Sequence, residues 1–159
     1  MINAEQLRLE VIRPTLEYLD SVIPYSIAAE NLLMGTCAQE SQMGTYIKQL
    51  GNGPALGIFQ MEPATESDIC ANYLNFRDDM AREVNLLIPK FVEGDLRDLV
   101  GNLYYATAMA RVHYYRVPEA MPLSDDVEGL AHYWKNHFNT KLGKGTVTEF
   151  VHNYNRYVK

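Results

Sequence analysis

The chain has 159 residues, of which 47% are hydrophobic, and carries a formal net charge of −6. This length and apolar content exclude a disordered chain, and we expect residues 1–159 to form a single domain around one core. The acidic balance argues against a nucleic-acid partner, which requires a basic face. No apolar run approaches the ~20 residues that span a bilayer, so we expect no membrane partner.

Apolar residues recur at helical spacing through the first part of the chain. Asn3 can cap a first helix, which Pro14 should kink or split. Ser26 can cap a second helix that runs to about Ser41. Glycines and a proline then interrupt the pattern, which leaves room for a short hairpin in residues 42–60.

The second part of the chain is also predicted to be helical. Pro63 suits the first turn of a third helix, and residues 78–88 form a fourth. The almost wholly apolar stretch from about 96 to 110 predicts a long, buried fifth helix. Ser124 can cap a sixth helix, and Thr146 begins a capping box for the last. The pattern therefore predicts an all-α protein of about seven helices.

The cysteine and histidine pattern points to neither a disulfide scaffold nor a metal site. Cys37 and Cys70 are too few for either, and we expect both to be small buried hydrophobes. His132 and His137 are five positions apart, so they do not share a helical face, and no HExxH motif occurs. We therefore expect no metal and no cofactor.

Glu40 is the candidate catalytic residue. It shares a predicted apolar helix face with Leu33 and Cys37. Poor hydration and the negative end of the helix dipole should both raise its pKa. A carboxylic acid that stays protonated near neutral pH is suited to protonate a glycosidic oxygen. By its spacing alone, an ordinary acid that ends a helix in solvent is the commoner arrangement.

A glycine-rich stretch follows Glu40 and leads to Gln60. Glycines beside an acid in apolar surroundings suit the close approach of a bulky chain such as a glycan. The amide of Gln60 can form hydrogen bonds with N-acetyl or hydroxyl groups of a sugar. Composition alone also fits an ordinary turn between two helices.

Two motifs resemble the soluble lytic transglycosylase domain. The first is Gln-Glu-Ser at residues 39–41, and the second is Gly-Ile-Phe-Gln-Met-Glu-Pro-Ala-Thr at residues 57–65. The family carries a catalytic Glu followed by Ser, then a Gly-apolar-apolar-Gln segment that runs into a Pro-x-Thr helix start. The likeness extends more loosely over residues 25–158. It implies a lysozyme-like, all-helical fold and cleavage of the β-1,4 bond between N-acetylmuramic acid and N-acetylglucosamine in peptidoglycan.

The resemblance also implies roles for individual residues. Glu40 would act as general acid and then as base, and Ser41 would help to place Glu40 or the sugar. The tyrosine of the family matches either Tyr133, as a supporting residue, or Phe138, in which case a hydroxyl is missing. The expected substrate-binding residues are Tyr46, Gly57, Ile58, Phe59 and Gln60.

Glu62 separates two chemistries. Lytic transglycosylases need no second carboxylate, because the C6 hydroxyl of the substrate attacks and gives a 1,6-anhydro product. Goose-type lysozymes are similar in this region and hydrolyse the bond, with an Asp at the position that Glu62 would take. Glu62 can therefore either hold an attacking water or simply place an acid at the helix that begins at Pro63.

Two other hypotheses about the function remain besides an active enzyme. A non-catalytic virion structural or glycan-binding module would keep the fold without the activity, and a helical interaction domain unrelated to glycans requires the motif match to be chance. The first residues lack the basic start and apolar run of a secretory signal. The expected setting is a phage-encoded protein that is virion-associated or released to the cell wall, with other virion proteins as possible partners.

Overall fold

Helices form the framework of the computed structural model, which describes residues 1–89, 97–139 and 143–159. Within these ranges the chain is all-helical, as predicted, and contains no strand. The α-helices are α1 (Ala4–Leu7), α2 (Arg13–Tyr18), α3 (Ile27–Ser41), α4 (Pro63–Asn72), α5 (Asp78–Asn85), α6 (Asp98–Gly101), α7 (Leu103–Tyr115), α8 (Val127–Trp134) and α9 (Val147–Tyr157).

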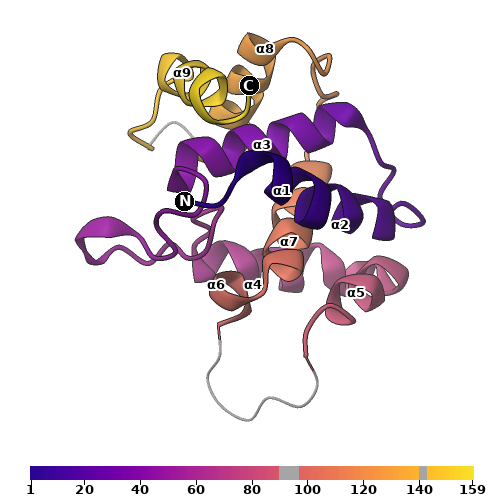
Figure 1. Cartoon of the computed structure of the whole chain (residues 1–159). Coiled ribbons are helices and arrows are strands. Elements are labelled where there is room, and N and C mark those ends of the chain that lie inside the picture. The colour runs from indigo at the N-terminus through magenta and orange to yellow at the C-terminus, as the bar shows by residue number, and fades with distance from the viewer. Residues whose placement is uncertain (90–96, 140–142) are drawn as a thin grey trace.

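Helix α3 crosses the middle of the molecule, with α8 and α9 on one side and α4, α5 and α6 on the other (Figure 1). It packs against α7, α8, α9 and the N-terminal helices, while α7 continues to α4 and α5. Every residue of α3 from Leu32 to Ala38 is buried. The end of α3, where Glu40 lies, is therefore held by contacts on several sides.

The N-terminal helical run begins as predicted. The side chain of Asn3 accepts a hydrogen bond from the backbone of Gln6 at 3.0 Å. The effect of Pro14 is a π-helical segment, Arg8–Ile12, between α1 and α2. Proline has no N–H to give to the carbonyl of Glu10, and the wider π turn accommodates that loss without ending the run.

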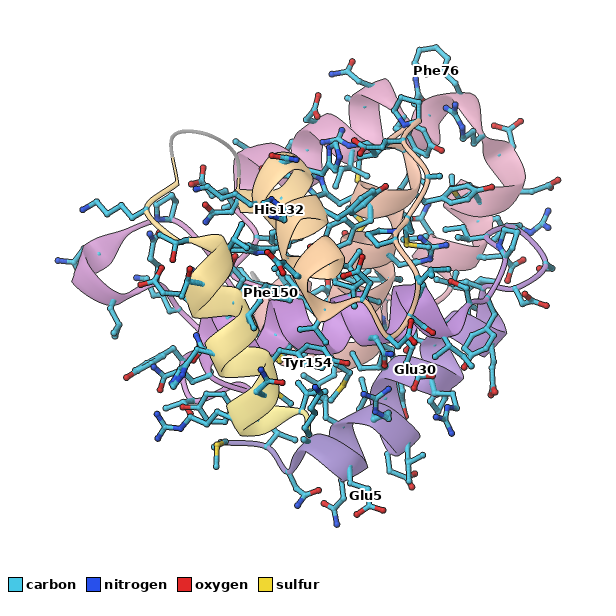
Figure 2. All side chains as sticks on the ribbon, turned by 90° about the horizontal axis from the view of Figure 1, so that it is seen from above. Glu5, Glu30, Phe76, His132, Phe150 and Tyr154 are labelled. Carbon is cyan, nitrogen blue, oxygen red and sulfur yellow. The ribbon has the colours of Figure 1, made fainter. Side chains whose placement is uncertain are left out.

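The packing of α9 on α3 depends on Gly35. A Cβ atom at Gly35 would lie 2.3 Å from the ring of Phe150 and 2.9 Å from that of Tyr154. Both rings point from α9 toward α3 (Figure 2). The predicted caps of these helices are confirmed: Ser26 accepts from the backbone of Ala29, and Thr146 forms a capping box.

A buried carboxylate joins α3 to the N-terminal run. Glu30 is 1% exposed and accepts hydrogen bonds from Arg8 at 2.6 Å, from Arg13 at 3.0 Å and from Tyr25 at 2.9 Å (Figure 2). Burial pushes the pKa of Glu30 upward, but these donors together outweigh it and leave the pKa below its usual value. The buried negative charge of Glu30 is thus balanced by the positive charges of Arg8 and Arg13.

Two predicted helices have other bounds in the structure. Helix α5 ends at Asn85 rather than at residue 88. The long fifth helix is two helices, because Asn102 leaves helical geometry, caps α7 through Tyr105 and donates to the carbonyl of Leu87. Its expected first residue, Leu96, lies outside the described residues.

The cap of α8 also differs from the prediction. It is Asp126, which accepts from the backbone of Gly129 at 2.8 Å, and not Ser124. The carbonyl of Ser124 instead accepts from the side chain of Asn31 at 2.9 Å, so the loop before α8 is attached to α3. After Trp134 the helix widens into the π-helical segment Lys135–Asn139.

No hairpin forms in residues 42–60. That region holds two isolated antiparallel bridges, from Lys48 to Leu56 and from Leu56 to Met61. Gly51 and Gly57 both have left-handed backbone, and neither bridge extends into a ladder of paired residues.

Cys37 is buried as expected, but Cys70 is exposed, which corrects the prediction that both are buried. Cys70 lies on α4, whose only fully buried side chain is that of Ile69. No helix in the described ranges combines the length and the apolar character that crossing a bilayer requires.

Candidate active site

A pocket of about 990 Å³ opens at the C-terminal end of α3. Its walls come from the loop after α3, the first turns of α4, the end of α7, the π segment Lys135–Asn139 and the chain just before α9. Four of the sequence-predicted site residues line this pocket: Glu40, Tyr46, Gln60 and Glu62.

Glu40 lies in the last turn of α3. Its Oε1 accepts a hydrogen bond from Nε1 of Trp134 at 2.8 Å. Burial raises the pKa of Glu40 to about 7, although the Trp134 hydrogen bond and the nearby Lys135 charge both favour the carboxylate. Glu40 is therefore protonated over much of the range below neutral pH and still faces the pocket.

Trp134 is fully buried and held from two sides. Its ring centroid lies 5.3 Å from that of Phe150 on α9. On another side the chain passes so closely at Gly145 that a Cβ atom there would lie 2.7 Å from Cη2 of Trp134. The packing leaves the indole little freedom, so its N–H stays directed at Glu40.

Gln60 reaches the pocket through a constrained turn. Its backbone is left-handed, with φ of 48°, and its side-chain amide donates to the carbonyl of Gly57 at 2.9 Å. Gly57 is itself left-handed and lies against the backbone of Leu99, where a Cβ atom would come within 1.8 Å of the carbonyl oxygen. Only glycine fits this contact between the loop and α6.

Ser41 is buried and does not line the pocket. Its hydroxyl donates to the carbonyl of Ile58 at 2.6 Å and accepts from the backbone N–H of Gly44 at 2.9 Å. Ser41 therefore connects the end of α3 to the segment that carries Gln60, and it acts on the pocket through the backbone.

Glu62 occupies the N-cap position of α4, but its side chain makes no capping hydrogen bond. Its backbone carbonyl accepts from Thr65 and Glu66, while its exposed side chain lines the pocket. The carboxylate is thus available to the pocket. Tyr46, from the loop after α3, lines the same pocket and is partly buried.

The remaining sequence-predicted residues lie behind the pocket wall. Ile58 and Phe59 are each 1% exposed and belong to the core, so Gly57, Ile58 and Phe59 shape the wall without lining it. Tyr133 is also buried, and its hydroxyl donates to the carbonyl of Glu119 at 2.9 Å. Of the two aromatic candidates, Phe138 is the one that lines the pocket.

Protein-family models, curated proteins and solved structures were all compared with this chain, and none matches.

Two sets of side-chain hydrogen bonds in the pocket were not predicted from the sequence. Trp134 lies among the buried residues of α8, and nothing in the spacing of the sequence indicates that its N–H would meet Glu40. The second contact joins Asp68, Arg116 and His113, whose side chains all line the pocket. These residues come from α4 and α7, so their sequence separation gave no signal of proximity.

The described part of the pocket shows no donor set for a metal ion. In residues 1–89, 97–139 and 143–159, no group of three or more His, Cys, Asp or Glu side chains is placed to hold one.

Proposed function

We propose that this chain cleaves the glycan strands of bacterial peptidoglycan, at the β-1,4 bond that follows N-acetylmuramic acid, as a lytic transglycosylase. Glu40 is the general acid and then the base. The observation that carries the proposal is a pocket-lining carboxylic acid whose pKa burial raises to about 7 and whose position is held by Trp134. The all-helical fold, with this acid at the end of a buried central helix, supports a lysozyme-like assignment.

Each step of the proposed reaction conserves protons. The Glu40 acid gives its proton to the glycosidic oxygen as the bond from that oxygen to C1 of muramic acid breaks, and the leaving sugar departs as an alcohol. The C6 hydroxyl of the same muramic acid then attacks C1, and the Glu40 carboxylate takes its proton. The products are a 1,6-anhydro sugar and the original acid, so no water is consumed.

A pocket of about 990 Å³ suits a bulky ligand such as several linked sugar rings. The amides of Gln39 and Gln60 and the ring of Tyr46 line it, and such groups hydrogen-bond and stack on sugars. This lining supports a glycan as the substrate class.

Hydrolysis is the second candidate, and one observation favours it. The Glu62 carboxylate lines the same pocket as Glu40 and caps no helix, so it can hold a water for attack at C1. Mass spectrometry of digested sacculi separates the two reactions, because anhydro ends identify a transglycosylase and reducing ends a hydrolase. Glu62→Gln should leave anhydro products forming, whereas it should abolish hydrolysis.

The test of the proposal itself is Glu40→Gln, which keeps the shape of the side chain and removes the acid. We expect loss of clearing of purified sacculi with the helical content unchanged. Glu17→Gln is the matched control, because it is the same substitution at a residue that is exposed on α2 and lies outside the pocket. Full activity in Glu40→Gln would refute the mechanism, and binding to sacculi without cleavage by the unmodified chain would favour a glycan-binding module.

A further inference from the structure

Arg116 is a positively charged residue that lines the pocket and belongs to neither of the two sequence motifs. It is the C-cap residue of α7, where the helix dipole favours positive charge, and it lines the pocket. About a quarter of its side chain, 24%, remains exposed. The protein as a whole is acidic, so a positively charged side chain that lines the pocket is suited to bind a negatively charged group of a ligand.

The guanidinium of Arg116 is held in place at two of its nitrogens. Nη1 donates to Oδ2 of Asp68 at 2.6 Å, and Nη2 lies 3.1 Å from Nδ1 of His113. Burial and the Arg116 charge lower the pKa of His113 to about 4, so the ring is neutral near pH 7 and accepts at Nδ1. The other Asp68 oxygen is occupied by the side chain of Asn72 at 2.8 Å.

These contacts leave donor capacity on Arg116. Asp68 accepts from Arg116 through a single oxygen. The Nε of Arg116 and the second hydrogens of its Nη1 and Nη2 have no partner among the described residues. A guanidinium that is already oriented loses little side-chain entropy when it binds a ligand. Its planar fork matches a carboxylate best, because two parallel hydrogen bonds can form.

We propose that Arg116 binds a carboxylate on the muramic acid substituent of the glycan, and so selects peptidoglycan over uncharged N-acetylglucosamine polymers. This inference rests on the proposed function, because it assigns a substrate group to the same pocket. Muramic acid differs from glucosamine by a lactyl ether, whose carboxyl is free in stripped strands and extended by a carboxylate-bearing peptide in native ones. Both sources present the same chemistry to Arg116.

Asp68 and His113 act as positioning residues in this arrangement. Asp68 offsets the Arg116 charge when no ligand is bound, and neutral His113 orients the fork without adding repulsion. His113 also packs edge-on against Phe138 at 5.0 Å between ring centroids, so the same residue supports an apolar part of the pocket wall.

Calorimetric binding in a Glu40→Gln background tests the inference without turnover. The probes are three tetrasaccharides: chitotetraose, the alternating N-acetylglucosamine–N-acetylmuramic acid tetramer with free lactyl groups, and that tetramer with its stem peptides. Arg116→Gln should lower affinity for at least one of the two carboxylate-bearing probes about tenfold relative to chitotetraose. The probe that loses more identifies the lactyl or the peptide carboxylate as the group bound.

Two controls make the result specific. Arg82→Gln removes the same charge from an exposed ion pair that does not line the pocket, and should leave the affinity ratio unchanged. Arg116→Lys keeps the charge without the planar fork and should recover only part of the ratio. An unchanged ratio in a folded Arg116→Gln variant would overturn the inference and leave the proposed function intact. Absence of binding to all three probes would instead count against the function itself.

Discussion

Nε1 of Trp134 donates to Oε1 of Glu40 at 2.8 Å, and this bond decides which oxygen of the acid can serve the pocket. An indole nitrogen is a donor only, so Oε1 acts as the acceptor, and this arrangement favours the acid proton on Oε2 because a carbonyl oxygen is the better acceptor. The hydrogen bond also strengthens as Glu40 becomes a carboxylate, which is its state after proton transfer.

Trp134→Phe should raise the pKa of Glu40 above its present value of about 7, because the variant removes a donor that favours the carboxylate. We expect the alkaline limb of the pH–rate profile to move up by about one unit and activity near pH 5 to fall about tenfold. NMR titration of Glu40 checks the shift without substrate. Phe150→Leu disturbs the same packing but keeps the donor, and should leave the titration midpoint near 7.

Glu40→Gln should stabilise the protein at alkaline pH. The pKa of Glu40 is raised on folding from 4.5 to about 7, so the native state holds its proton longer and stability falls as pH rises through this window. Glutamine does not ionise, so the variant should gain up to about 3 kcal/mol over the unmodified chain at pH 8 and almost nothing near pH 4. Urea unfolding at the two pH values measures the difference, and an equal gain at both would contradict the buried acid.

Ser41→Ala should loosen the wall of the pocket. The substitution leaves the carbonyl of Ile58 and the N–H of Gly44 without their partner, at a cost of about 2 kcal/mol. Thr45→Ala is the matched control, because it removes an exposed hydroxyl from the same loop and should cost under about 0.5 kcal/mol. Thermal unfolding and sacculus clearing follow the two variants, and equal losses would argue against the role of Ser41.

Gly57→Ala and Gly51→Ala separate backbone strain from collision. Both glycines have φ near 75°, but an added Cβ meets the Leu99 carbonyl at Gly57 and open space at Gly51. We expect a loss of about 1 kcal/mol for Gly51→Ala and about 3 kcal/mol for Gly57→Ala. Only Gly57→Ala should also reduce glycan cleavage, because the side-chain amide of Gln60 donates a hydrogen bond to the Gly57 carbonyl. Matching losses in chemical denaturation would show that the contact with α6 matters less than its geometry suggests.

Local chemistry accounts for what could be predicted of the fold. The caps at Asn3, Ser26 and Thr146 each use a side chain and a backbone N–H three residues apart, so a short stretch of sequence contains the whole interaction. Asp126 was harder to predict, because Ser124 is an equally suitable cap two residues earlier in the sequence. Asn102 was harder to predict because one of its partners, the carbonyl of Leu87, lies 15 residues away.

For Glu40, the order of residues along the chain is enough to predict an acid at the end of an apolar helix beside a glycine-rich turn. It did not determine what the acid touches. Helix packing brings Trp134, 94 residues away, close enough to donate to it, and brings Arg116 from the end of α7 into the same pocket. Helical spacing reports which face of a helix is buried, whereas the partner of a buried polar atom depends on how separate helices pack together.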